Sequence, residues 1–201
     1  MPSVVDIANL ALSHLGEDAT ISSIDPPEGS AEAEHAAMFY PQARDALLEM
    51  HEWRFATKRV LLALTASDTF EWGYAYALPS NMLRALAVLP ETASAEDDGD
   101  DFDQQLDADD VQIILTNCEE ASLKYTARVT DTTRFPPLFV EALSWLLASY
   151  MAGPLIKGDQ GRAVAKGCMQ MFAAFLTQAK VSDANQRKVE PEHTPTWIGG
   201  R

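Results

Sequence analysis

Histidine is the side chain of this sequence best suited to acid–base or metal chemistry, and it occurs four times. The positions are His14, His35, His51 and His193. A zinc-protease motif needs a glutamate directly after its first histidine and a second histidine one helical turn later. His51 is followed by Glu52, but Phe55 stands where the second histidine is required. The spacing therefore predicts no zinc site.

The stretch from Gly153 to Gly158 resembles the start of a phosphate-binding loop. Asp159 occupies the position of the lysine that would hold the phosphates, and its carboxylate would repel them. The sequence also lacks the G-x-S-x-G motif of hydrolases and the G-x-G-x-x-G motif of dinucleotide-binding proteins. We therefore expect no enzyme, with no catalytic residues, no metal and no cofactor. An enzyme whose groups assemble from distant positions remains an alternative.

Residues 91–110 hold ten acidic side chains and no lysine or arginine. An EF-hand calcium loop needs glycine at its sixth position, acids at its first, third and fifth, and glutamate at its twelfth. Placing Gly99 sixth puts Ser94 first and Gln105 twelfth, so the pattern fails. We predict a solvated acidic loop, with an irregular cation site as the alternative. Its candidate functional residues are Asp97, Asp98, Asp100 and Asp101.

The formal net charge is −15, but outside 91–110 twenty acids face fifteen bases, which is an ordinary surface. This balance argues against adhesion to DNA or to anionic lipid. Cys118 and Cys168 lie far apart and form no C-x-x-C motif, so we interpret them as buried free thiols in a reducing compartment. Met1 leads into an amphipathic pattern without a basic region, and we expect no secretory signal.

Helices are predicted at both ends of the chain. Ser3 can cap a first helix together with Asp6, and Gly16 suits its end. A second helix is predicted from about residue 30 to 50, with a kink or a restart at Pro41. The nearly uniform apolar stretch 138–155 favours the central helix of a bundle or one packed between subunits; a membrane span is the alternative. A last helix opens at Asp159.

The middle of the chain follows the two-residue period of strands. Strands are predicted at 58–65, 74–78, 82–89, 111–116 and 121–129. Residues 117–120 suit a hairpin turn between the last two. The last strand alternates apolar and polar residues, which predicts that only one of its faces is buried.

The predicted fold class is α+β, mainly α. A bundle of about four helices is built from residues 1–56 and 131–188, and a small antiparallel β-domain, 57–130, is inserted between the second and third long helices with the acidic loop 91–110. Residues 189–201 form an extended C-terminal tail.

Three stretches of the sequence resemble one known family. They are the opening helix with ALSHLGE at 11–17, WGYAYALPSNMLRAL at 72–86, and YTARVTDTTRFPPLFVEALSWLLASYMAGPL at 125–155. The family is the tail tubular protein A, or head–tail adaptor, of short-tailed double-stranded DNA bacteriophages, and the similarity spans roughly residues 4 to 180. It implies a dodecameric ring between the portal protein and the tail nozzle protein, with the genome passing through the bore. It also implies a helical bundle interrupted by a small β-domain. The acidic run and Pro136 depart from the family pattern.

Within such a ring, each subunit meets its neighbours through two different faces. Trp53 and Phe55 could bury area against the next subunit while the nearby cations set the register. The alternative is that the aromatic side chains close the junction of helices and strands within one subunit. The candidate interface residues are Trp53, Arg54, Phe55, Lys58 and Arg59.

The C-terminal tail is proline-punctuated yet carries Trp197 and Ile198, which are costly to leave in water. We expect it to dock on the portal or on an adjacent subunit; a tail folded onto its own subunit or left free is the alternative. Its candidate docking residues are Thr196, Trp197, Ile198 and Arg201.

The resemblance implies a virion protein of the neck between head and tail, made in the host bacterial cytoplasm, with no membrane partner. A bore of net negative charge would let DNA slide without specific binding. The main alternative from another class is a non-viral soluble helical module that binds or regulates a partner.

Overall fold

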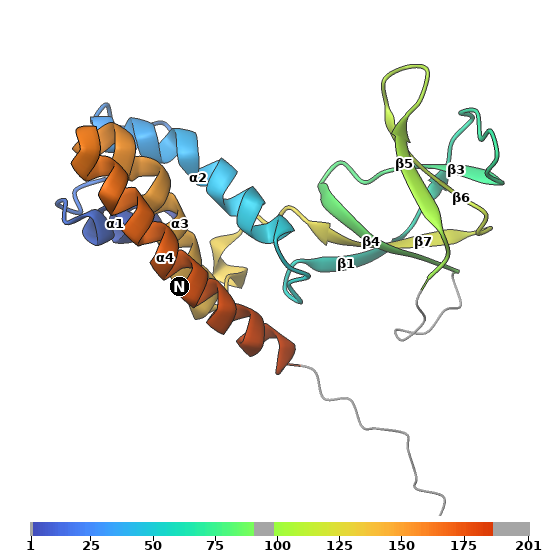
Figure 1. The fold of residues 1–201 in the computed structure, drawn as a ribbon. Coiled ribbons are helices and arrows are strands. Elements are labelled where there is room, and N and C mark those ends of the chain that lie inside the picture. Colours follow the sequence, from blue (N-terminus) through green and yellow to red (C-terminus); the bar gives the residue numbers. More distant parts are fainter. Residues whose placement is uncertain (1, 91–98, 187–201) are drawn as a thin grey trace, which may run out of the picture.

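The computed structural model describes residues 2–90 and 99–186. These residues form four α-helices and two small antiparallel sheets, so the predicted mixed α+β class is confirmed. The helices are α1 (Val4–Leu15), α2 (Ala31–Glu49), α3 (Pro137–Ile156) and α4 (Gly158–Ala184). The helices occupy one end of the molecule and the strands the other (Figure 1).

The first two helices begin where the sequence predicts. Ser3 and Asp6 form the expected capping box, in which the Asp6 amide donates to Ser3 Oγ and the Ser3 amide donates to Asp6 Oδ2. Gly16 ends α1 in the left-handed conformation, with φ of 78°. Pro41 lies inside α2, which continues without interruption. The predicted restart is therefore wrong, because burial of the helix around Pro41 outweighs one lost backbone hydrogen bond.

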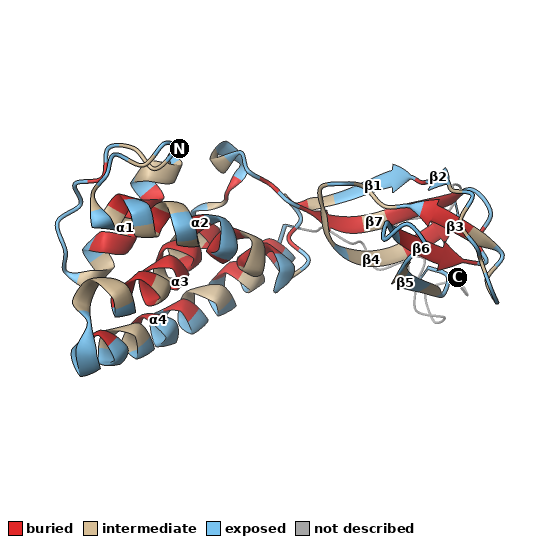
Figure 2. Cartoon of the chain, turned by 90° about the horizontal axis from the view of Figure 1, so that it is seen from above, coloured by how far each residue is buried: buried red, intermediate tan, exposed pale blue. Residues whose placement is uncertain are grey.

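α3 is the central helix. It packs against α1, α2 and α4, and it buries residues around its whole circumference (Figure 2). Its length and composition would allow a membrane span, but 61% of its most apolar window is buried inside this protein. α4 packs closely against it, because a Cβ added at Gly161 would lie 3.0 Å from the Ala152 carbonyl oxygen. The prediction of a central bundle helix fits this packing.

The strands form two sheets rather than the single sheet that was predicted. Their orders are β1-β7-β4 and β2-β3-β6-β5, and side chains from both sheets share one buried cluster that includes Tyr76, Val88, Ile114 and Leu123. The strands are β1 (Thr57–Leu61), β2 (Ala63–Leu64), β3 (Tyr74–Ala77), β4 (Met82–Pro90), β5 (Phe102–Leu106), β6 (Gln112–Thr116) and β7 (Ala121–Ala127).

The predicted hairpin at 117–120 is wrong. β6 and β7 do not pair with each other, and residues 117–120 carry the chain from one sheet to the other. The side chain of Asn117 accepts a hydrogen bond from the Gly73 amide at 2.9 Å, and Glu120 has a positive φ of 52°. This segment is held by tertiary contacts, which alternation along one strand does not encode.

Two further strand predictions need correction. Both faces of β7 are buried, because it is the middle strand of its sheet and α2 contacts it; Ser122 and Thr126 on the polar face are 5% and 0% exposed. Residues 102–106, predicted as part of the acidic loop, form β5. Phe102 packs against the shared cluster, and the β5 backbone pairs with β6, while Asp103 remains exposed.

Polar contacts fasten the strands to the helices. Arg128, which follows β7, donates from Nε to Asp45 Oδ2 of α2 at 2.8 Å. Lys124 Nζ lies 2.5 Å from a carboxylate oxygen of Glu52. One buried cluster lies among the helices and another among the strands, and the connections α2–β1 and β7–α3 join them.

Candidate docking site at the helix–strand junction

Trp53 lies in the short connection between α2 and β1, where it is 1% exposed. Its ring meets the ring of Phe139 edge to face at 5.1 Å, and Phe55 meets Phe139 in the same manner at 4.9 Å. The indole Nε1 donates to the Leu47 carbonyl oxygen at 2.8 Å. That carbonyl belongs to the last turn of α2, where backbone acceptors lack a helical donor. Trp53 therefore closes the end of α2 within one chain.

Asp183 ties the end of α4 to the same connection. Its carboxylate accepts a hydrogen bond from the Arg54 amide at 3.1 Å and lies 3.5 Å from Nε2 of His51. Arg54 in turn donates from its side-chain Nε to the Asp183 carbonyl oxygen at 3.2 Å. Asp183 is 4% exposed, so these contacts take the place of the water that the carboxylate loses on burial. The contacts of Asp183 with Arg54 and His51 therefore hold the α2–β1 connection against the end of α4.

The five predicted interface residues differ in their exposure and in their contacts within the chain. Trp53 is 1% exposed in the single chain, which supports the alternative that it closes the junction within one subunit, and Phe55 is half-buried in the aromatic cluster. The contact of Arg54 with Asp183 lies within the chain. Lys58 and Arg59 lie exposed on β1, an edge strand, although Arg59 also donates to Ser122 Oγ and to the Pro90 carbonyl oxygen. Their contact with a neighbour stays a prediction.

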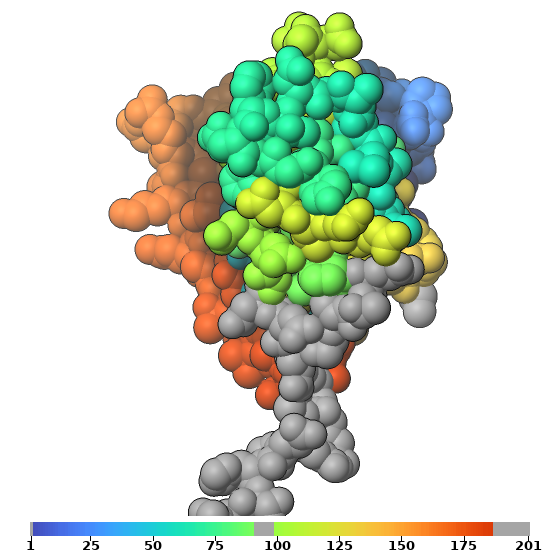
Figure 3. Space-filling view, turned by 90° about the vertical axis from the view of Figure 1, so that its right-hand side faces the viewer, coloured from blue at the N-terminus to red at the C-terminus, as the bar shows by residue number. Residues whose placement is uncertain are grey.

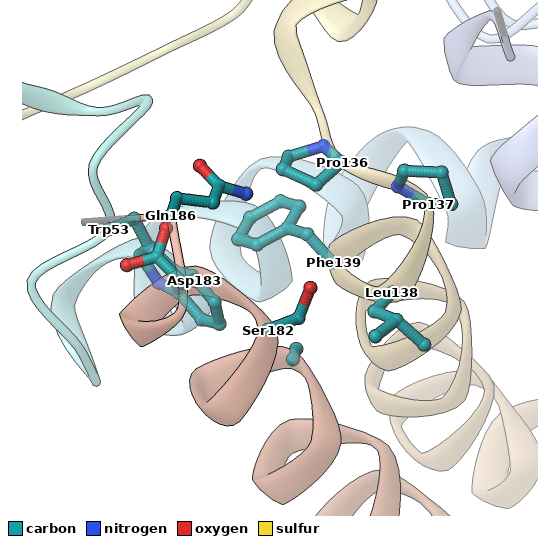
Figure 4. A pocket seen from close by; sticks show the side chains of 9 residues that line it. Trp53, Pro136, Pro137, Leu138, Phe139, Ser182, Asp183 and Gln186 are labelled. Carbon is teal, nitrogen blue, oxygen red and sulfur yellow. The ribbon is translucent and has the colours of Figure 1, made fainter. Parts of the chain in front are cut away.

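A pocket of about 240 Å³ opens between the end of α4, the start of α3 and Trp53 (Figure 4). Phe139 lies at its centre, and the hydroxyl of Ser182 points toward the cavity. The lining residues are Trp53, Pro136, Pro137, Leu138, Phe139, Ala179, Ser182, Asp183 and Gln186. Ligand pockets for drug-sized molecules begin at about 300 Å³. This pocket suits one or two large side chains better than a cofactor.

The proline pair leaves α3 without a side-chain cap and forms one wall of the pocket. Pro136 is the N-cap residue, makes no side-chain hydrogen bond to the helix, and is followed by Pro137 in the first turn. The only local sequence signal that could have indicated this wall is the pair of adjacent prolines directly before an apolar helix. The partners across the pocket, Ala179 and Ser182, come from more than forty residues further along and carry no local signal.

The other candidate residues lie away from this pocket. Asp100 and Asp101 are exposed beside β4, where the Asp100 amide donates to the Val88 carbonyl oxygen at 2.7 Å. Asp97, Asp98 and the whole segment 187–201, with Thr196, Trp197, Ile198 and Arg201, lie outside the described residues. Within 2–90 and 99–186, no group of three or more histidine, cysteine, aspartate or glutamate side chains could hold a metal.

The two thiols and His14 have pKa values that their surroundings shift. Cys118 and Cys168 are free and buried, and burial raises the pKa of both, that of Cys118 to about 11. His14 stacks on Trp145 with the ring centroids 3.6 Å apart, and its Nε2 lies 3.0 Å from Ser144 Oγ. Burial lowers the pKa of His14. The two thiols are buried and His14 is half-buried, and none of the three lines the pocket.

No protein-family model and no curated protein sequence matches this chain.

Proposed function

We propose that this chain is the subunit of a head–tail adaptor of a short-tailed bacteriophage. Twelve copies would form a ring between the portal and the tail nozzle, seal the capsid vertex and pass the genome during ejection. The resemblance over residues 4–180 supports this proposal. The order of the elements, two helices, then all seven described strands, then two helices, also supports it. In this account the chain is a helical bundle with a β-domain inserted between the second and third long helices.

The observation that carries the proposal is a set of exposed apolar side chains on β1, on β2 and in the connection from β2 to β3. Leu61, Leu64 and Phe70 are 55%, 65% and 76% exposed. Figure 3 shows this end of the molecule, where the teal residues around β2 and β3 form much of the surface. Phe70 also has a positive φ of 50°, a conformation that costs free energy in a residue other than glycine. These three exposed side chains lie within ten residues of one another in the sequence, and large apolar side chains left in water are candidates for a surface that another protein covers.

Charges of opposite sign lie on edge strands of the two sheets. β1 carries Lys58 and Arg59 at the edge of one sheet, and β5 carries Asp103 at the edge of the other. A ring needs two unlike faces that fit each other, and opposite charges help to set the register between them. We infer that the β1 edge of one copy faces an acidic face of the next.

The acidic residues also suit the passage of DNA. Asp100 and Asp101 are exposed, and the chain carries a formal net charge of −15. A ring of such copies would repel phosphate groups, so the genome would slide through the bore without specific binding. The protein would be made in the host bacterial cytoplasm and end in the neck of the virion, without a cofactor and without catalysis.

The test is assembly on the portal. The purified chain is mixed with the portal ring of the same virus, and the mass of the complex is measured. We expect a complex with a ring of twelve adaptor copies. Leu64→Glu should prevent ring formation while the monomer stays folded, and Met169→Glu, at a residue 43% exposed on α4, should leave it intact. A chain that never binds the portal would favour the non-viral binding module instead.

A further inference from the structure

We propose that the pocket at the helix–strand junction receives the Trp197–Ile198 segment of a second copy of this chain. The occupant would link neighbouring subunits by an exchanged C-terminal tail. This inference rests on the proposed self-assembly, and it adds the site and the segment through which copies are joined.

The walls of the pocket fit an aromatic side chain with one polar atom. Pro136, Pro137 and Leu138 present apolar surface to the pocket, and the buried rings of Phe139 and Trp53 lie beneath it. Aromatic side chains gain most from such surroundings, and buried tryptophan also needs an acceptor for its indole N–H.

That acceptor is present at the mouth of the pocket. The side chains of Ser182 and Gln186 are exposed there, and neither makes a hydrogen bond within the described residues. Each carries an oxygen that can accept from an indole N–H. Asp183 beside them accepts from the Arg54 amide and is 4% exposed, so it forms part of the wall.

The occupant follows from where the described chain ends. α4 ends at Ala184, and Gln186 lies on the pocket itself, so fifteen further residues begin at its rim. In that segment Trp197 and Ile198 are adjacent, and Trp197 is its only aromatic residue. Burying such a pair removes its apolar surface from water, which stabilises the contact.

The segment favours a neighbouring copy over its own pocket. Ten residues lie between Gln186 and Trp197, and Pro191 and Pro195 restrict the backbone at two of these positions. A chain of this length spans at most roughly 35 Å, which sets the distance within which the pocket of a neighbouring copy must lie. A return to its own pocket would need the chain to reverse between Gln186 and Trp197, in a stretch that holds two prolines and no glycine, whereas the pocket of a neighbouring copy requires no reversal.

The experiment measures binding of a fluorescent peptide of residues 187–201 to the full-length chain, at a chain concentration where sedimentation shows a monomer. The wild-type chain and a Trp197→Ala/Ile198→Ala chain should bind this peptide equally, because a monomer has no neighbour to fill its pocket. The Trp197→Ala peptide should bind at least about tenfold more weakly.

A matched pair of variants locates the site. Ser182→Tyr fills the mouth of the pocket from an exposed helix position and should weaken peptide binding at least about tenfold. Ala184→Tyr, exposed on the same last turn but not lining the pocket, should bind as the wild type does. Circular dichroism confirms that both variants fold.

Three outcomes would overturn the proposal. If only the Trp197→Ala/Ile198→Ala chain binds the peptide, the tail occupies its own pocket. If no chain binds it, the tail docks elsewhere, for example on the portal. If Ser182→Tyr binds it as well as Ala184→Tyr does, the site is a different one. Because the portal is absent from this assay, its failure leaves the adaptor function to be decided by the assembly experiment.

Discussion

Replacing Trp53 by alanine distinguishes a residue that holds one subunit together from one that joins two. The side chain is 1% exposed in the single chain, and its ring packs on Phe139 and His51. Its Nε1 also satisfies the Leu47 carbonyl oxygen at the end of α2. Trp53→Ala would leave a cavity where helices meet strands and an acceptor without its donor.

The expected loss follows from the size of the side chain. Removing a buried tryptophan side chain costs about 3–5 kcal/mol of unfolding free energy. With a urea dependence of about 2 kcal/mol per molar, the midpoint should fall by roughly 1.5–2.5 M. Trp53→Phe keeps a ring but loses the hydrogen bond to Leu47, so an additional effect of about 1 kcal/mol is expected from the unpaired carbonyl.

The assay is urea unfolding of the monomer followed by far-ultraviolet circular dichroism, which reports mainly on the helices. Phe70→Ala serves as the control, because that side chain is 76% exposed and its loss should change the stability by less than about 0.5 kcal/mol. An unchanged midpoint for Trp53→Ala, combined with loss of ring assembly on the portal, would refute the reasoning and restore Trp53 as an interface residue.

Three further measurements test the packing. Gly161→Ala should be less stable than Gly167→Ala by about 1–2 kcal/mol in urea unfolding. A Cβ at 161 would lie 3.0 Å from the α3 backbone, whereas a Cβ at 167 would have no atom within 4 Å. Equal stabilities would contradict the close α3–α4 contact. Burial lowers the pKa of His14 from 6.5, so its contribution to stability is complete above pH 6.5 and is lost as the pH falls from there through the lowered pKa. The thermal unfolding midpoint of His14→Gln should therefore fall less over that pH range than the midpoint of the wild type. Parallel curves of midpoint against pH would exclude this role of His14. Cys118 and Cys168 should resist iodoacetamide at pH 8 in the folded protein and react in urea, since burial raises both pKa values; rapid labelling of the native chain would show that the thiols are accessible.

The helices could be predicted from the sequence because their signals are local. Ser3 and Asp6 mark the start of α1 and Gly16 marks its end, and each signal lies within a few residues of the end that it marks. The apolar circumference of α3 predicted burial on all sides, and α1, α2 and α4 supply it. Pro41 misled the prediction because the cost of a proline in a helix depends on how firmly the flanking turns are packed.

Strand pairing could not be predicted in the same way. Alternation along β6 and β7 predicted strands in about the right places, yet it carries no information on partners, and the two strands belong to different sheets. β5 was missed because the aspartates around Phe102, at positions 100, 101 and 103, hid the apolar residue that anchors it. Charge density in 91–110 was interpreted as a loop, although exposed edge strands accept charged side chains on their solvent face.

The pocket depends on contacts that no single stretch of sequence contains. Trp53, Phe139 and Ser182 come from three distant segments, and Asp183 meets Arg54 across most of the chain. The sequence singled out Trp53 and Phe55 as important, but the choice between a contact within one chain and a contact between chains needed the burial of the folded chain. Trp53 is buried in the single chain, and Lys58 on exposed β1 is left as the candidate for the neighbour.

The most direct test of the central claim is the mass of the complex formed between the purified chain and the portal ring of its virus. The account predicts a single species in which twelve adaptor copies cover one portal, with Leu64→Glu unable to form it. A portal that remains bare at saturating chain concentration, or a chain that binds it in one or two scattered copies, would contradict the proposed role.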